Sequence, residues 1–131
     1  MSLFYKMQPV SDNINPTNKV IGLIARAVTC GNIDLKTIAQ DIADRSTFSR
    51  AEVLGVLEEL VLTAEIHLSR GFSVTFGELG TLSVSATSRI VKNENEIRSN
   101  SIKVKRIVYR PSPSMTRRIK SLKFERLPSK P

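Results

Sequence analysis

The segment from Ser49 to Arg70 most constrains the fold, because it predicts a long helix with little polar surface. Ser49 and Glu52 have the S-x-x-E spacing of a capping box, and Phe48 with Val53 supplies a hydrophobic staple. Gly71 then stands where helices commonly end. A helix that is apolar nearly all round needs burial on several sides, which favours a second subunit over a central place in a monomeric core. Its apolar positions are Val53, Leu54, Val56, Leu57, Leu60, Val61, Leu62, Ala64, Ile66 and Leu68.

Strands and a first helix are expected before this segment. Leu3–Met7 alternates as a short strand that Pro9 should stop, and a loop is expected over residues 10–18. The residues 20–29 are β-branched and apolar, which favours a strand, and Gly31 with Asn32 then turns the chain. Asp34 is the expected N-cap of a helix whose apolar face is Leu35, Ile38, Ala39, Ile42 and Ala43.

The pattern changes to strands after Gly71. Alternation in residues 72–76 and 82–86, with Gly77-Glu78-Leu79-Gly80 between them, predicts a hairpin. A polar stretch, 87–101, leads to a strand over 102–110, where the alternation slips near Arg106 and indicates a bulge. Ser112-Pro113 is typical of a helix start, and residues 122–127 predict a last short strand. The order of elements is α+β.

Charge is divided unevenly along the chain. Residues 1–80 carry 7 Lys/Arg and 9 Asp/Glu, a net of −2, whereas residues 81–131 carry 13 Lys/Arg and 3 Asp/Glu, a net of +10. A solubilising surface normally mixes the two signs. The split therefore favours a polyanion held by the C-terminal part.

The residues offer no catalytic or metal-binding constellation. The chain has one cysteine, Cys30, and one histidine, His67. We therefore do not expect a tetrahedral zinc site within one subunit. Glu58 and Glu59 are adjacent, so they diverge on a helix, and phosphate-loop and dinucleotide motifs are absent. We expect no enzyme activity, no cofactor, no metal and no small-molecule substrate. The lone cysteine fits a reducing cytoplasm, and neither a signal peptide nor an apolar stretch long enough for a membrane span is evident.

The order and spacing of these features resemble the bacterial HU/IHF histone-like family. The matching features are a short helix joined through a Ser/Thr turn to a long capped helix, the Gly77–Leu82 turn, and the return Val108-Tyr109-Arg110-Pro111 into a basic helix at residues 115–120. Tyr5-Lys6 and Lys123-Phe124-Glu125 resemble the terminal strands of longer HU-like proteins of Bacteroides-type bacteria. The implied organisation is an N-terminal strand extension (1–33), an HU-like DNA-binding domain (34–121) with an arm at about 85–106, and a C-terminal strand and tail (122–131).

The resemblance implies an HU/IHF-like fold with a helical base, a β-hairpin arm and extra terminal strands, intertwined as a homodimer that binds double-stranded DNA. The expected function is largely sequence-nonspecific and architectural, in the cytoplasmic nucleoid. The expected DNA contacts are Arg89, Lys92, Arg98, Lys103, Lys105, Arg106, Arg110, Arg117, Arg118 and Lys120. The expected dimer interface is Val53, Leu57, Leu60, Val61, Ala64, Leu68, Phe76 and Leu79.

Two departures from the family keep other hypotheses open. The segment 85–106 lacks the tip proline that kinks DNA in classical members, and it carries Glu94 and Glu96. Ile90, Val91 and Ile97 are each candidates for an apolar wedge that inserts between base pairs in place of that proline. Structured RNA offers the same phosphate attraction as DNA. An HU-shaped scaffold that binds proteins, with weak affinity for DNA, is the alternative of a different class.

Overall fold

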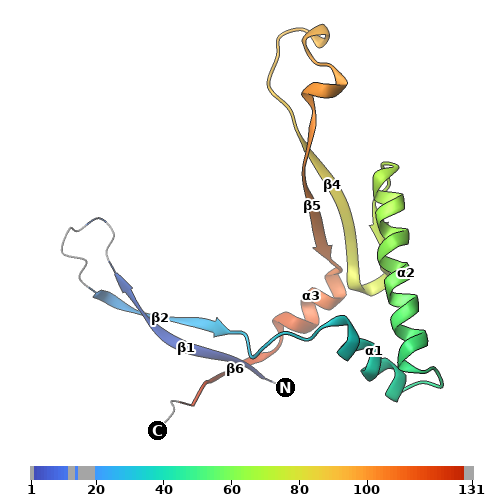
Figure 1. Cartoon of the computed structure of the whole chain (residues 1–131). Coiled ribbons are helices and arrows are strands. Elements are labelled where there is room, and N and C mark those ends of the chain that lie inside the picture. Colours follow the sequence, from blue (N-terminus) through green and yellow to red (C-terminus); the bar gives the residue numbers. More distant parts are fainter. Residues whose placement is uncertain (1, 12–13, 15–19, 129–131) are drawn as a thin grey trace. The chain divides into compact units, whose positions relative to one another are not determined.

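The computed structural model describes residues 2–11, 14 and 20–128 (Figure 1). The chain divides into two compact units, and each is described by itself: Asp34–Arg117, and Met1–Ile33 together with Arg118–Pro131. Helices and strands coexist in the described residues, so the predicted α+β class is confirmed. None of the helices in this part of the chain combines the length and the apolarity that a bilayer span requires.

Two capped helices begin the unit Asp34–Arg117. In α1 (Leu35–Asp44), the Asp34 carboxylate accepts from the Thr37 backbone N–H at 2.9 Å. In α2 (Arg50–Ser69), the Ser49 hydroxyl accepts from the Glu52 N–H at 3.2 Å and donates to the Glu52 carboxylate at 3.0 Å. Both predicted N-caps are confirmed.

The end of α2 explains why the first strand of the predicted hairpin is short. Gly71 has φ +90°, its N–H bonds to Leu68 O, and the Phe72 N–H bonds to His67 O, which is a Schellman C-cap. The backbone at Phe72 is therefore still completing the helix. Strand β3 covers only Val74–Thr75, so the prediction of a strand over 72–76 was too long.

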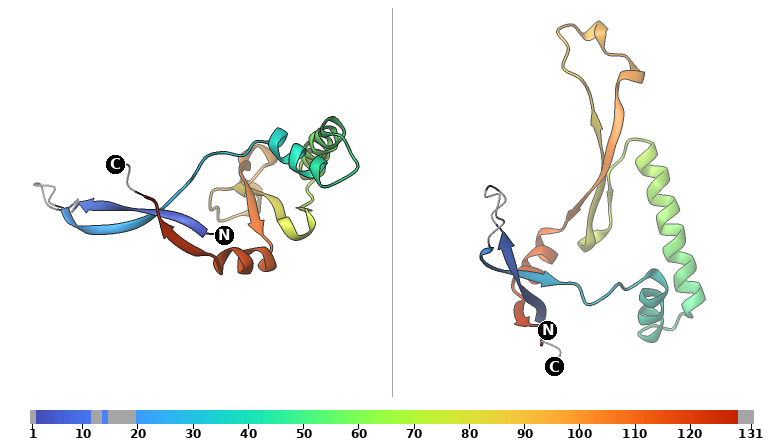
Figure 2. Two further views of the ribbon diagram at one scale, coloured as in Figure 1. Left: turned by 90° about the horizontal axis from the view of Figure 1, so that it is seen from below. Right: turned by 60° about the vertical axis from the view of Figure 1, so that its left-hand side comes forward.

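Strands β3, β4 (Gly80–Thr87) and β5 (Lys103–Pro111) form an antiparallel sheet in the order β3-β4-β5. β4 and β5 make the long hairpin seen in both views of Figure 2, here called the arm. A single-turn 3-10 segment (Gly77–Leu79) joins β3 to β4. Helix α3 (Pro113–Lys120) follows β5, and the Met115 N–H bonds to the Ser112 hydroxyl at 3.2 Å, as the Ser-Pro start predicts.

Very little of this unit is buried within one chain. Among the described residues, the only buried hydrophobic side chains are Ala39, Val53 and Ala64. α1 packs against α2, but large apolar side chains on α2 and on the arm stay exposed. A single chain therefore leaves many large apolar side chains in contact with water.

The other unit contains a second sheet, in the order β2-β1-β6. β1 (Ser2–Ser11) pairs antiparallel with β2 (Val20–Val28) and parallel with β6 (Lys123–Arg126). The strands expected near residues 20–29 and 122–127 are thus confirmed, with narrower bounds.

Pro9 does not stop β1, contrary to the prediction, and Val10 and Ser11 belong to the strand rather than to a loop. β6 pairs only with Ser2–Tyr5, so β1 has a single neighbouring strand at Pro9. A proline is tolerated there because its missing N–H can face the side without a strand. The rest of the expected loop falls mainly on residues outside those described.

Candidate nucleic-acid interface

The arm has one apolar and one cationic face, and a bulge keeps them distinct. Ser85 lies opposite Arg106 while Ala86 lies opposite Val104, so Lys105 is an extra residue in β5. The bulge indicated by the slipped alternation is therefore confirmed. Without it, Lys105 would fall on the same face as Ile107, because side chains alternate along a strand. With it, Val104 stays on the apolar face.

The cationic face joins basic residues of β5 to hydroxyl residues of β4. Thr81 lies opposite Arg110, Ser85 opposite Arg106, and Thr87 opposite Lys103, so each pair shares this face. The three cations are exposed, and none of them pairs with a carboxylate within the described residues. Small hydroxyl neighbours leave the charged groups accessible and add hydrogen-bond donors. Phosphate oxygens accept hydrogen bonds from Lys, Arg, Ser and Thr side chains. We call this face of the arm the cationic face. Its members are Thr81, Ser83, Ser85, Thr87, Lys103, Arg106 and Arg110, with the half-buried Val108 opposite Ser83.

The base of the arm is fixed by hydrogen bonds that the sequence did not indicate. The Tyr109 hydroxyl donates to Leu79 O at 2.8 Å, and the Ser112 hydroxyl donates to Glu78 O. Gly80 has φ +137°, and a Cβ there would lie 2.3 Å from Arg110 O. Only glycine allows β5 to approach this closely, so the turn and the cationic face depend on each other.

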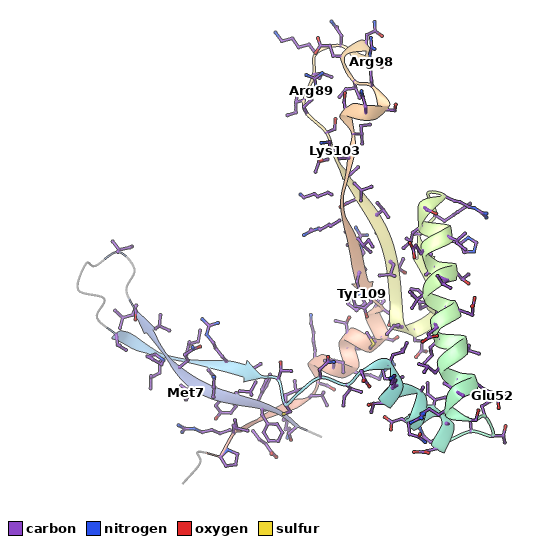
Figure 3. The ribbon with its side chains drawn as sticks, viewed as in Figure 1. Met7, Glu52, Arg89, Arg98, Lys103 and Tyr109 are labelled. Atoms are coloured by element: carbon purple, nitrogen blue, oxygen red, sulfur yellow. The ribbon has the colours of Figure 1, made fainter. Side chains whose placement is uncertain are left out.

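The tip of the arm holds three more of the predicted contacts. Arg89 and Arg98 lie at the tip in Figure 3, beyond Lys103, which starts β5, and far from Tyr109 at the base. The Arg89 guanidinium donates to Glu96 O at 2.8 Å, so it closes the tip as well as adding charge. Lys92 and Arg98 are exposed. Short 3-10 turns at Glu94–Glu96 and Ser99–Ser101 shape the tip.

Of the three wedge candidates, the structure distinguishes one. Ile90 is fully exposed, whereas Val91 and Ile97 are half-buried. Val91 and Ile97 therefore already pack within the tip, and Ile90 is the apolar side chain that faces solvent there. The sequence held no signal for this difference, because all three are apolar residues in a polar stretch.

The remaining predicted contacts lie on α3 and are exposed: Arg117, Arg118 and Lys120. The boundary between the units falls within this helix, after Arg117. Arg118 and Lys120 belong to the unit with the β2-β1-β6 sheet, so they are not grouped with the arm cations. Lys105, in the bulge, is exposed beside the cationic face.

Next to the apolar face of the arm is an open cavity of about 660 Å³. It is lined by α2 residues and by inward-facing residues of the sheet. Six of the eight predicted interface residues line it: Leu60, Val61, Ala64, Leu68, Phe76 and Leu79. The other two, Val53 and Leu57, lie at a second hollow beside Ile42 and Phe48. Val53 is already buried within one chain.

No candidate metal site emerges in the part of the chain described. Residues 2–11, 14 and 20–128 contain no group of three or more His, Cys, Asp or Glu side chains placed to hold a metal ion. Cys30 is a free, exposed thiol. His67 has its ring edge-on to Phe72, with centroids 6.2 Å apart, which is a packing contact at the end of α2.

Two capped helices are followed by a sheet in which a turn flanked by glycines joins β3 to β4, and by a long two-stranded arm. This order of elements defines an HU-like protein. More closely, the chain belongs to the family described as "HU domain fused to wHTH, Ig, or Glycine-rich motif", whose model matches residues 1–126. No curated protein matches the sequence.

A solved structure supports the fold. A candidate bacterial DNA-binding protein from Bacteroides vulgatus ATCC 8482 is similar over 98% of this chain, with a TM-score of 0.62 and 17% identity. This chain spans 50% of the length of that one. A cocrystal structure of Anabaena HU with DNA is similar over 68% of this chain and 98% of its own, with a TM-score of 0.45 and 15% identity.

Proposed function

We propose that this protein binds double-stranded DNA without catalysis and largely without sequence preference, as a basic homodimer with an architectural role in the cytoplasmic nucleoid. The cationic face is the observation that carries the proposal. It presents three exposed cations and four hydroxyl groups on one side of a projecting hairpin. In this proposal the DNA-binding domain is residues 34–121, and the contacts extend to the tip, the bulge and α3.

The expected lack of sequence preference follows from the kind of contact. Flexible Lys and Arg side chains beside hydroxyls suit phosphates, which carry no direct sequence information. Helix α3 has eight residues and carries its cations in its second half, which does not resemble a helix built to read base edges. Affinity would then come mainly from counterion release.

The homodimer is supported by the exposed apolar surface of one chain. Leu60, Val61 and Leu79 are 44%, 59% and 54% exposed, and all line the 660 Å³ cavity between α2 and the arm. A second copy that filled this cavity would remove from water apolar side chains that one chain leaves exposed. It would also place a second arm on the same assembly, so that two cationic faces act together.

The test is a charge reversal on the arm, Lys103→Glu/Lys105→Glu/Arg106→Glu, compared with an equal reversal on the helices, Lys36→Glu/Arg50→Glu/Arg70→Glu. All six side chains are exposed, so both variants should fold and both change the net charge equally. We expect the arm variant to lose at least about 100-fold in affinity for random-sequence duplex DNA, and the helix variant to lose far less. Equal losses in the two variants would show that only net charge matters and would overturn the arm as the site.

Competition between duplex DNA and duplex RNA of equal length separates the two polyanions. Preferential displacement by RNA would replace DNA with structured RNA in the proposal. Retention of a protein partner after nuclease treatment, with no DNA affinity at low salt, would favour the scaffold that Glu94 and Glu96 suggest.

A further inference from the structure

The outer edge of β2 has no strand beside it among the described residues. β2 contains no proline and one charged residue, Arg26. Natural edge strands usually carry several charges, a proline or a bulge that discourages pairing. The irregularity in β2 is at its start: Val10 lies opposite Gly22 and Ser11 opposite Val20, so Ile21 is the extra residue. Residues 22–28 are therefore a regular edge with unused backbone hydrogen-bonding groups.

Across β1 and β2, the face of this sheet that carries Tyr5 is apolar up to that edge. The register places Tyr5 opposite Ala27, Met7 opposite Ala25 and Pro9 opposite Leu23, so these side chains share a face. Figure 3 shows side chains along the two strands, with Met7 labelled. Tyr5, Ala25, Ala27 and Phe124 line a hollow of about 290 Å³ on this face. The wall of the hollow nearest the open edge consists of two alanines, and Leu23, further along β2, is 67% exposed.

We propose that β2 pairs edge to edge with β2 of a second copy, antiparallel, with Ala25 on the two-fold axis and Leu23 of each copy in the hollow of the other. An axis perpendicular to the sheet makes identical edges run antiparallel and keeps the same face on the same side. With Ala25 on the axis, Leu23 lies opposite Ala27, so a large side chain meets a small one. The hollow beside Ala27 is then the space that the leucine enters.

Competing registers fit less well. Side-chain alternation fixes which residues can share a face. An axis at Arg26 would put two guanidinium groups directly opposite each other, and like charges in that position are destabilising. An axis at Ile24 would pair only residues 22–26 regularly, because the bulge at Ile21 interrupts the ladder. The axis at Ala25 pairs all of Gly22–Val28 and leaves the bulge outside.

This contact is separate from the DNA-contacting arm and from the cavity beside α2. It gives the added N-terminal strands a role that binding DNA does not require, which is to join copies of the protein. A second copy suits this edge better than a charged partner, because residues 22–28 carry a single charge, that of Arg26.

Cysteine crosslinking of the full chain tests the contact, with Cys30→Ser removing the exposed native thiol. Ala25→Cys places two thiols next to the axis, and a short bismaleimide should link most of the protein into covalent dimers. Leu23→Cys is the matched control, because its two copies would be separated by four strand positions, about 13 Å. It should crosslink poorly alone but well when mixed with Ala27→Cys. Failure of Ala25→Cys to crosslink, or equal yields from Ala25→Cys and Leu23→Cys, would overturn the proposal.

A second pair of variants distinguishes the proposed contact from crosslinking between chains that meet by random diffusion. Leu23 and Ile21 are similarly exposed, at 67% and 69%, but only Leu23 enters the hollow in the proposed register. Leu23→Glu should therefore reduce the Ala25→Cys yield at least about tenfold, while Ile21→Glu leaves it unchanged, with circular dichroism confirming that both fold. The arm reversal Lys103→Glu/Lys105→Glu/Arg106→Glu should also leave the yield unchanged. The edge contact and DNA binding therefore succeed or fail independently.

Discussion

At the scale of single residues, Gly80 connects the fold to the candidate site. Its backbone lies at φ +137°, and a methyl group there would lie 2.3 Å from Arg110 O and 2.9 Å from the Tyr109 ring. The glycine turn was recognisable in the sequence. Its reason was not, because the crowding comes from a strand about thirty residues further along the chain.

Gly80→Ala should lower the free energy of unfolding by at least about 1–3 kcal/mol, the range for a residue held in an unfavourable backbone conformation. Gly55→Ala is the control: a Cβ at Gly55 meets nothing within 4 Å, and α2 should gain about 0.5–1 kcal/mol. Both are measured by urea unfolding at one protein concentration. An unchanged midpoint for Gly80→Ala would contradict the close approach.

Asp34 predicts a pH dependence. The Thr37 backbone N–H, and then the Thr37 hydroxyl, lower the pKa of the Asp34 carboxyl below its ordinary 3.8. Its contribution to stability is therefore fully present above the ordinary pKa and is lost as the pH falls through the lower folded value. Wild-type protein should lose more stability than Asp34→Asn between about pH 5 and pH 2. Parallel stability curves for the two proteins would contradict the cap as the cause.

At the scale of elements, local signals were sufficient for the helices, but for the strands they gave the approximate positions and not the full extent or the pairing. Caps at Asp34, Ser49 and Ser112 lie within a few residues of the groups they satisfy, so the sequence predicts them. The continuation of β1 through Pro9 depends on where β6 ends, more than a hundred residues away. The parallel pairing of β1 with β6 had no local signal at all.

The bulge in β5 gives a test at this scale. Deleting Lys105 should leave Val104 and Ile107 on one face and Lys103 and Arg106 on the other, so the free energy of unfolding should change by no more than about 1 kcal/mol. Deleting Val108 would instead move every residue before it to the opposite face. We expect that protein to lose the cooperative unfolding transition seen by circular dichroism. Equal effects of the two deletions would contradict the register.

At the scale of the whole molecule, the sequence indicated burial that one chain does not provide. Only Ala39, Val53 and Ala64 are buried hydrophobic residues among those described, although α2 is apolar nearly all round. Six of the eight predicted interface residues could be chosen from the helix pattern. Their division between two hollows could not, because it depends on how α1 and the arm meet α2.

Leu79→Glu tests the proposed homodimer. Leu79 is 54% exposed in one chain, so a glutamate costs little there, but a second copy filling the cavity would bury the unpaired charge. Leu23→Glu, which removes the proposed β2 edge contact, isolates this interface. Sedimentation equilibrium should show the Leu23→Glu protein at twice the mass of one chain, and adding Leu79→Glu should shift it toward a single chain. Adding Ile90→Glu instead, on the arm tip and outside the cavity, should leave the mass unchanged. A monomeric Leu23→Glu protein would contradict the dimer.

The most direct test of the central claim is the salt dependence of binding to linear duplex DNA of random sequence. Two cationic faces supply six arm cations per dimer, from Lys103, Arg106 and Arg110, so the logarithm of the binding constant should fall against the logarithm of salt concentration with a slope of about −5 or steeper. The tip and α3 would add to that slope. Binding that is absent at low salt, or that does not weaken as salt rises, would contradict a phosphate-binding arm.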